Sequence, residues 1–231
     1  MQNTVQLYLA KIDLTLSKKD INSLLKHVSK GSRKRINKFR FIEDALHTLY
    51  GEVMVRFMVS KQYSINIDQI EILKNTYGKP YIINPPIYFN ISHAGEWVAC
   101  AISGQNIGID VELIKNENKD ILDIARRFFH KEEYLFLRAK EESECITAFY
   151  DLWTLKESYI KWIGTGLTTP LNSFYFNISD NQIFVTDINQ VAHPFFRQYP
   201  ISGYKLSVCS TIPCFPDQID FVDMKEIISA T

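Results

Sequence analysis

The 231-residue sequence has no excess of charge of either sign, because 26 Lys and Arg residues balance 26 Asp and Glu residues. A neutral chain has no bulk attraction for nucleic acid or for an anionic membrane, so a polyanionic ligand must be held by a local group of cations. Low-complexity segments and long flexible linkers are also missing. With 46% hydrophobic and 13% aromatic residues, the chain has ample material for a globular core in one or two domains.

Long apolar runs and patterned cysteines are absent too. No stretch approaches the roughly 18 apolar residues that a membrane span needs, and the start, MQNTVQLYLAKIDL, has no basic segment followed by a long apolar one. Cys100, Cys145, Cys209 and Cys214 show neither a CxxC pair nor a Cys/His metal spacing. We therefore expect a soluble, cytoplasmic protein with reduced thiols and no membrane partner.

Hydrophobic periodicity predicts two α+β lobes of about 110 residues each. In the first half, VQLYLAKI predicts a strand, INSLLKHVSKGSRKRINKF a basic helical segment, and residues 44 to about 60 a helix. The β-rich runs IYFNIS, EWVACAIS and NIGIDVEL then predict an antiparallel meander. In the second half we expect helices in ILDIARRFF, in KEEYLFLRAK and over about 147–163, then strands in SFYFNIS, NQIFVTDI, HPFFRQY and GYKLSVCS.

Asp110 and Glu112 lie two residues apart in the β-rich segment NIGIDVE. Alternate residues of a strand share a face, so both carboxylates point the same way, with Cβ atoms roughly 6.6 Å apart. They repel each other unless a cation lies between them, and Mg²⁺ prefers carboxylate oxygens together with waters and substrate phosphates. The alternative is an edge strand with a solvated polar face. Ile107, Ile109 and Val111 fill the opposite face, which favours a strand beside a cleft.

A second polar group lies in the helical segment DLWTLKESYIKWIGTG. Helical spacing places Trp153, Glu157 and Lys161 in one column at the border of the apolar face. On an exposed helix, Glu157 and Lys161 would form an ordinary i, i+4 ion pair worth about 0.2 to 0.5 kcal/mol. Lys156 lies beside Glu157, and charges are rarely gathered on such an aromatic-rich segment without a partner, which argues against an ordinary exposed pair. Gly164 is expected to end the helix as a C-cap.

The segment SKGSRKRINKFR carries many cations and no acid. Its composition predicts a local anion site, although a solvated helix face or a nucleic-acid patch fits the charge equally. Few aromatic residues are interleaved with the basic ones, so we do not expect a nucleic-acid partner. Lys79 in YGKP and Ser92 with His93 in NISHAG add polar groups near the predicted sheet. Each of these alone is typical of a turn lysine, a surface serine or a core histidine.

Five motifs occur in an order that resembles the 4′-phosphopantetheinyl transferase superfamily, in its larger, surfactin-synthetase-activator type. They are GKP (78–80), FNISHAG (89–95), IGIDVE (107–112), RRFF (126–129) and LWTLKESYIK (152–161). The similarity extends from the first predicted helix to near the C-terminus. It implies an α+β pseudo-dimer of two similar α+β lobes, with the active site in the cleft between them.

The resemblance also implies which ligand each of the two lobes contacts. The N-terminal lobe, residues 1–108, is expected on the 3′-phosphoadenosine side of coenzyme A. The C-terminal lobe, residues 109–231, is expected on the metal and carrier-protein side. One chain would then hold a complete site, so we expect a monomer.

The implied reaction transfers the 4′-phosphopantetheine group of coenzyme A to a serine of an apo acyl or peptidyl carrier protein and releases 3′,5′-ADP. Asp110, Glu112 and Glu157 match the carboxylates that hold Mg²⁺ on the pyrophosphate, with Mn²⁺ as the alternative because both suit hard oxygen ligands. Glu157 is also the candidate to accept the serine proton, and Lys161 is expected to face the phosphates. Phosphoryl transfer needs mainly positioning and charge neutralisation, which such residues supply.

Further residues match positions that contact the coenzyme in the family. They are Arg35, Thr48, Lys79, Ser92 and His93. Three positions depart from the family pattern and concern affinity for the coenzyme rather than the reaction. Ser32 stands where relatives often have lysine, His47 where many have arginine, and Thr165 lies in GTG where GKG is common.

Carrier-protein recognition is expected from Leu113 to Ile124 and in the helices that follow. The stretch KNENKD has mixed charge, so we expect contact through apolar residues such as Ile121, Leu122 and Phe129.

Two other functions stay open at this point. One is a Mg²⁺-dependent phosphohydrolase acting on coenzyme A or a nucleotide, since acids, a metal and a basic pocket would also suit water as the nucleophile. The other is a non-catalytic module that binds coenzyme A or carrier proteins. Loss of one of the three carboxylates would be the signature of such a module, and all three are present here.

Overall fold

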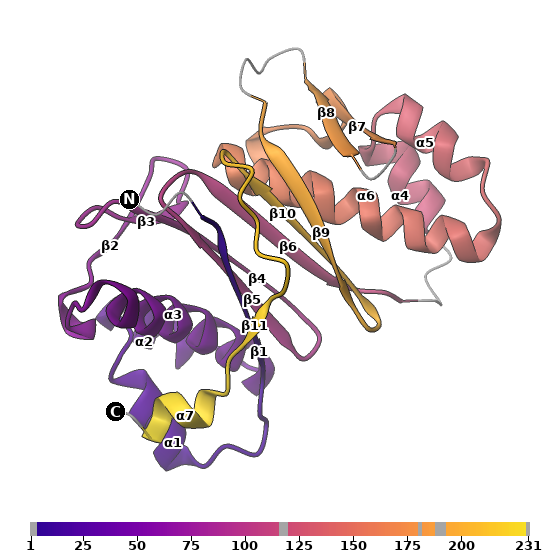
Figure 1. The fold of residues 1–231 in the computed structure, drawn as a ribbon. Coiled ribbons are helices and arrows are strands. Elements are labelled where there is room, and N and C mark those ends of the chain that lie inside the picture. Colours follow the sequence, from indigo (N-terminus) through magenta and orange to yellow (C-terminus); the bar gives the residue numbers. More distant parts are fainter. Residues whose placement is uncertain (1–3, 116–119, 180–181, 188–192, 230–231) are drawn as a thin grey trace.

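The computed structural model describes residues 4–115, 120–179, 182–187 and 193–229 (Figure 1). The helices are α1 (Lys18–Leu25), α2 (Lys30–Ile36), α3 (Ile42–Tyr63), α4 (Ile121–Phe128), α5 (Lys131–Arg138), α6 (Glu142–Ile163) and α7 (Met224–Ser229), with short 3-10 turns at Ile67–Gln69, Gly166–Thr168 and Leu171–Ser173. The strands are β1 (Gln6–Lys11), β2 (Ile72–Lys74), β3 (Pro80–Ile82), β4 (Ile87–Ala94), β5 (Trp97–Ser103), β6 (Ile107–Leu113), β7 (Phe174–Ser179), β8 (Gln182–Asp187), β9 (Phe195–Ile201), β10 (Tyr204–Ser210) and β11 (Asp220–Phe221).

Each half of the molecule places a long helix on a sheet whose strands are mostly antiparallel (Figure 1). In the first lobe, α3 packs on β4 and β5 of a six-stranded sheet with the order β11-β1-β5-β4-β3-β2. In the second, α6 packs on β6 and β10 of a three-stranded sheet with the order β6-β10-β9. Both helices have 22 residues. The α+β fold with two similar lobes, predicted from the sequence, is confirmed.

The prediction of a three-stranded meander is wrong for its last strand. β4 and β5 pair as expected, from Tyr88↔Ser103 to Ala94↔Trp97. β6 instead pairs antiparallel with β10, far along the chain, and so belongs to the second sheet. The reason lies in the pattern of apolar residues, because Ile107, Ile109 and Val111 join a core in which the two sheets pack face to face. That core removes β6 from the plane of β4 and β5.

The two long helices begin earlier in the sequence than predicted. α3 begins at Ile42 and α6 at Glu142, both earlier than the apolar pattern indicated. Acidic residues stabilise the positive end of each helix dipole, including Glu43 in α3 and Glu144 in α6. α6 ends as expected at Gly164, which adopts the left-handed conformation with φ 80°.

The basic segment forms two helices rather than one. α1 is followed by a break, and Ser29 then caps α2 by accepting a hydrogen bond from the Ser32 amide.

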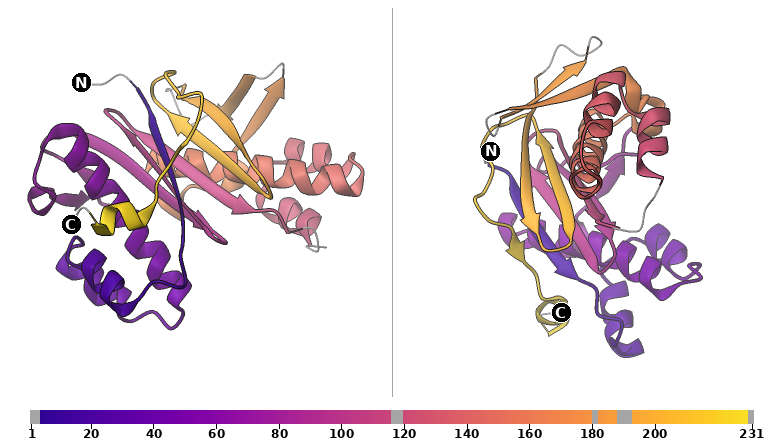
Figure 2. Two further views of the ribbon diagram at one scale, coloured as in Figure 1. Left: turned by 60° about the horizontal axis from the view of Figure 1, so that its bottom comes forward. Right: turned by 90° about the vertical axis from the view of Figure 1, so that its right-hand side faces the viewer.

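The C-terminal residues return to the first lobe, where α7 lies close to α1 (Figures 1 and 2). β11 pairs in parallel with β1, and Met224 and Ile227 of α7 are buried in the core beneath α3. The predicted lobe boundaries, 1–108 and 109–231, stay a prediction.

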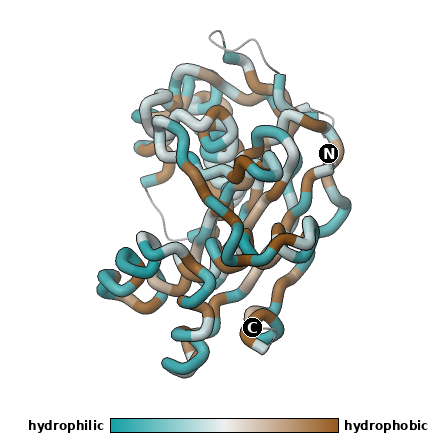
Figure 3. The backbone as a smooth tube through the Cα atoms, turned by 90° about the vertical axis from the view of Figure 1, so that its left-hand side faces the viewer, coloured by the Kyte–Doolittle hydropathy of each residue, from teal (hydrophilic) through white to brown (hydrophobic). Residues whose placement is uncertain are grey.

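Hydrophobic segments run through the centre of the molecule, and polar ones lie mostly on the outer helices and loops (Figure 3). Among the helices of the described residues, none is long and apolar enough to cross a membrane.

Candidate active site

β6 lies directly against α6 because residue 108 has no side chain. A Cβ atom on Gly108 would overlap the Ser158 carbonyl oxygen and lie 2.5 Å from the Trp162 nitrogen, both in the backbone of α6. Asp110 and Glu112 share the face of Gly108, since alternate residues of a strand point the same way. The two predicted carboxylates therefore face the helix.

Asp110 is the most buried of the predicted acids, at 3% exposure. Its Oδ1 accepts hydrogen bonds from Lys161 Nζ at 2.6 Å and from Ser92 Oγ at 2.8 Å. Lys161 Nζ also donates to Ser92 Oγ and to the Ile109 carbonyl, which engages all of its protons. The ion pair of Lys161 is thus with Asp110, across the helix–strand interface, and not the i, i+4 pair with Glu157 that helical spacing also allowed.

The other Asp110 oxygen, Oδ2, is buried and has no hydrogen-bond partner in the described part of the chain. Burial raises the pKa of Asp110, whereas Lys161 lowers it. Burial, followed by the Asp110 charge, raises the pKa of Glu112 to about 7. The same two causes raise the pKa of Glu157. All three carboxyl groups are harder to ionise than in water, so a cation among them would be stabilised.

These acids do not form a ready-made coordination shell. Within the described ranges, no group of three or more His, Cys, Asp or Glu side chains is arranged so that it could hold a metal ion. Asp110, Glu112 and Glu157 are instead an electrostatically coupled acid cluster in which Lys161 is the cation.

β4 holds β6 in place through Ser92 and through Asn90, which the sequence interpretation missed. Asn90 Oδ1 accepts a hydrogen bond of 2.9 Å from the Ile109 amide, and Ser92 Oγ accepts one of 3.3 Å from the Val111 amide. Both acceptors lie on one face of β4, because they are two residues apart. Ser92, predicted to contact the coenzyme, therefore lies within the acid cluster and bonds to Asp110.

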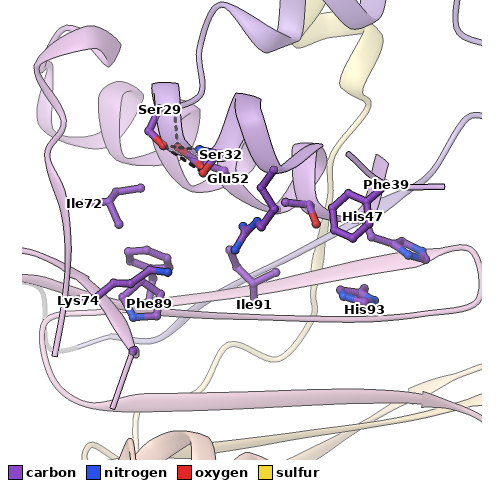
Figure 4. A pocket seen from close by; sticks show the side chains of 15 residues that line it. Ser29, Ser32, Phe39, His47, Glu52, Ile72, Lys74, Phe89, Ile91 and His93 are labelled. Atoms are coloured by element: carbon purple, nitrogen blue, oxygen red, sulfur yellow. Dashed lines mark hydrogen bonds between the residues drawn. The ribbon is translucent and has the colours of Figure 1, made fainter. Parts of the chain in front are cut away.

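The opposite face of β4 lines a cavity of about 470 Å³ under α2 and α3 (Figure 4). Phe89, Ile91 and His93 form its sheet side, while Arg35 and Thr48 contribute from the helices. The volume lies within the range of about 300–1,000 Å³ typical of small-molecule sites. Three of the predicted coenzyme contacts, Arg35, Thr48 and His93, thus share one cavity.

His93 stacks on His47, with ring centroids 4.5 Å apart and an angle of 11° between the planes. His47 Nε2 donates to the Gly95 carbonyl at 2.9 Å, while its Nδ1 is buried without a partner among the described residues. Burial, followed by the charges of His47 and Lys161, lowers the pKa of His93. His93 lines the cavity and directly follows Ser92, which bonds to Asp110, so these two residues of β4 connect the cavity with the acid cluster.

Lys79 differs from the other predicted coenzyme contacts because its ammonium group is turned toward the second lobe. Lys79 Nζ donates to the carbonyls of Ile107 and Trp162, at 3.0 and 3.1 Å. Burial lowers its pKa to about 8. Lys79 is not among the residues that line the cavity, although its neighbours Gly78 and Pro80 are.

Lys156 forms a fully buried ion pair with Glu133, 2.7 Å away. Lys156 Nζ also donates to the carbonyls of Leu171 and Phe174, and Glu133 accepts a hydrogen bond from the Phe176 amide. This network fixes the side of α6 that faces away from the acid cluster. No local pattern identifies Glu133, because its partners lie on other elements.

The expectation for carrier contacts needs correction at two of its three residues. Ile121 and Phe129 are 6% and 4% exposed and belong to the core of the second lobe. Leu122, at 37%, and Phe128, at 42%, are exposed on the same helix. The side of α4 that contains Ile121 and Ala125 is buried against α6. The exposed side is therefore the adjacent one, not the side predicted from the sequence. Residues 116–119 of the predicted segment lie outside the described residues.

The cavity and the acid cluster lie on opposite sides of β4, since Phe89, Ile91 and His93 line the cavity whereas Ser92 bonds to Asp110. The chain belongs to the 4′-phosphopantetheinyl transferase superfamily. Residues 106–209 match the model of that superfamily, and residues 15–105 match the model of the 4′-phosphopantetheinyl transferase N-terminal region.

Individual relatives place the chain near the surfactin type. It is 38% identical to the 4′-phosphopantetheinyl transferase Sfp of Bacillus subtilis, over 97% of this chain and all of that one. It is 36% identical to the 4′-phosphopantetheinyl transferase gsp of Aneurinibacillus migulanus, over 89% of this chain and 86% of that one. Among solved structures, the holo-[acyl-carrier-protein] synthase of Thermotoga maritima matches with a TM-score of 0.37 and 18% identity, over 45% of this chain and 61% of that one. The resemblance inferred from the five motifs is confirmed.

Proposed function

We propose that this protein transfers the 4′-phosphopantetheine group of coenzyme A to a serine of an apo acyl or peptidyl carrier protein. The observation that carries the proposal is the buried, unpartnered Oδ2 of Asp110, in an acid cluster that adjoins a basic cavity. Such an arrangement suits a nucleotide whose pyrophosphate lies at the acids. We assign the 3′-phosphoadenosine side to the lobe of residues 1–108 and the metal and carrier side to residues 109–231.

Asp110, Glu112 and Glu157 would hold Mg²⁺, or Mn²⁺ in its place. The donor chemistry fits, because hard divalent ions prefer carboxylate oxygens and because one of these oxygens is buried without a donor. The three side chains are not arranged as a coordination shell in this structure, where Lys161 is the cation, so they would have to turn toward the ion. When bound, the ion would neutralise pyrophosphate charge, including the charge that develops on the departing 3′,5′-ADP.

The protein's own residues supply positioning and a proton acceptor. The carrier serine oxygen forms a bond to the phosphorus next to pantetheine, and the bond from that phosphorus to the bridging oxygen of 3′,5′-ADP breaks. Glu157 accepts the serine proton. Lys161 holds Asp110 and Ser92 in the free protein and is close enough to the cluster to face the phosphates in the complex.

The partners are coenzyme A and a carrier protein. The proposal includes a cytoplasmic monomer without a nucleic-acid or membrane partner. Carrier contacts are assigned to the exposed side of α4, where Leu122 and Phe128 lie.

The test is the intact mass of an apo carrier protein after incubation with this protein, coenzyme A and Mg²⁺. We expect the carrier to gain one phosphopantetheine group, and we expect no gain with EDTA or with the Asp110→Ala variant. Free 3′,5′-ADP without any gain on several carriers would support the phosphohydrolase instead. Neither product would support a binding module.

A further inference from the structure

Lys74 lines the cavity but matches none of the coenzyme contacts that the resemblance implies. It comes from β2, the edge strand of the six-stranded sheet, whereas Arg35 comes from α2 on the other side of the cavity. In Figure 4, Lys74 lies beside Phe89 on the sheet side, and Ser29 and Ser32 lie on the helix side. Lys74 and Arg35 are therefore cations on two different walls.

Neither cation is neutralised by a neighbour. Lys74 and Arg35 form no ion pair with any residue that the structure describes. Glu52, an acid that lines the cavity, is already engaged, because its Oε1 accepts hydrogen bonds from Arg56 Nε at 3.0 Å and from the Ser29 amide at 2.8 Å. The cavity thus carries positive charge that is available to an anion.

The β2–β3 turn directs Lys74 and Lys79 to different places. Asn75 Oδ1 accepts from the amides of Tyr77 and Lys79, and Asn75 Nδ2 donates to the Gly164 carbonyl at the end of α6. These bonds fix the turn against the second lobe, where Lys79 is anchored to two carbonyls. Lys74 precedes the turn and lines the cavity, so it is the lysine of this hairpin that an anion in the cavity meets.

The position of Lys74 indicates which anion. His47 and His93 lie at one end of the cavity in Figure 4, and Ile72 and Lys74 lie at the other. The histidine end adjoins the acid cluster, because Ser92, the neighbour of His93 on β4, donates to Asp110 Oδ1 at 2.8 Å. When the pyrophosphate lies at the acids, the ribose extends along the cavity, and its 3′-phosphate is then directed toward Lys74.

We propose that Lys74 and Arg35 grip the 3′-phosphate of coenzyme A from opposite walls, which makes Lys74 a specificity-determining residue for the 3′-phosphorylated coenzyme. The inference rests on the proposed transferase function. It extends that function by naming a residue that discriminates coenzyme A from its 3′-dephospho form.

The test compares the binding of two nucleotides by calorimetry, which requires no transfer. Adenosine 3′,5′-bisphosphate carries the 3′-phosphate, and adenosine 5′-phosphate lacks it. We expect Lys74→Gln to weaken the bisphosphate about tenfold, the loss of one charge-assisted contact, and to leave the monophosphate within about twofold. Lys74→Arg should retain most of the affinity, and Lys61→Gln, an exposed lysine of α3 outside this cavity, should change neither.

Equal weakening of both nucleotides, no weakening of either, or no binding of the bisphosphate to the unchanged protein would overturn the inference. Transfer to the carrier is measured in parallel, with coenzyme A and with 3′-dephospho-coenzyme A. The KM for coenzyme A should rise about tenfold in Lys74→Gln, with kcat and the KM for the dephospho form unchanged. Selective nucleotide binding without any transfer would leave this inference standing while refuting the proposed function.

Discussion

Substituting Gly108 by alanine tests whether close contact between β6 and α6 builds the site. The added Cβ would overlap the Ser158 carbonyl oxygen and lie 2.5 Å from the Trp162 nitrogen and 3.1 Å from the Lys161 carbonyl carbon. All three atoms belong to the helix backbone, so no flexible side chain can move aside. The helix must shift away from the strand, and overpacking of this kind costs about 1–3 kcal/mol of unfolding free energy.

The shift should affect catalysis more than nucleotide binding. It separates Asp110 and Glu112 on the strand from Glu157 and Lys161 on the helix, whereas the cavity is lined by α2, α3 and strands β2, β3 and β4. A misplacement of about 1 Å can lower a rate about 10²-fold, so we expect a loss of that order in kcat. Affinity for adenosine 3′,5′-bisphosphate should change little.

The assay is urea unfolding together with transfer to an apo carrier protein. Gly31→Ala is the matched control, because the nearest atom to its added Cβ is Ser29 Oγ at 3.8 Å. In a helix this change should stabilise the protein by about 0.5–1 kcal/mol. If Gly108→Ala kept both its unfolding free energy, within about 0.5 kcal/mol, and its rate, the contact between β6 and α6 would not be what builds the site.

Three other changes follow from the contacts described. Lys156→Met leaves Glu133 charged and buried, so urea unfolding should show a loss of about 3–5 kcal/mol, and a loss below about 1 kcal/mol would contradict the buried pair. Burial lowers the pKa of Lys79 to about 8, so the unfolded chain holds this proton to higher pH than the folded protein does. The Lys79 contribution to unfolding free energy should therefore rise from pH 8 to pH 10, by about 2–3 kcal/mol, and the rise should vanish in Lys79→Met. Leu122→Asp should raise the KM for the carrier without changing the Tm, whereas Ile121→Asp should lower the Tm, and equal Tm values for the two variants would contradict the assigned faces of α4.

The sequence was sufficient where a local period determines the structure. Alternation placed Asp110 and Glu112 on one face of a strand, and helical spacing placed Glu157 and Lys161 one turn apart, as the structure has them. It was insufficient where the partner is distant in the chain. The same helical spacing allowed an ion pair within α6, and the burial of Asp110 beside the helix decides in favour of the longer-range pair.

The error in the meander has the same origin. β4, β5 and β6 follow one another with short links, which favours one sheet, yet the sheet neighbour of β6 is β10. Local patterns cannot report that Asn90 bonds to the Ile109 amide, since the two residues lie on strands that are not sheet neighbours. For the same reason no local sequence pattern identifies Lys74 as a binding residue, because its proposed role depends on the cavity that α2 and α3 complete.

Side chains alternate between the two faces of β4, so this one strand contributes both to the cavity and to the contact with β6. Phe89, Ile91 and His93 face the cavity, whereas Asn90 and Ser92 face β6. A ligand in the cavity and the acids on β6 are therefore separated by the thickness of a single strand. Because β4 is fixed on one side by α3 and on the other by hydrogen bonds to β6, the strand keeps the two at a constant spacing. In the proposed transfer, where catalysis depends mainly on position, this spacing would hold the bound coenzyme in a fixed relation to the acids.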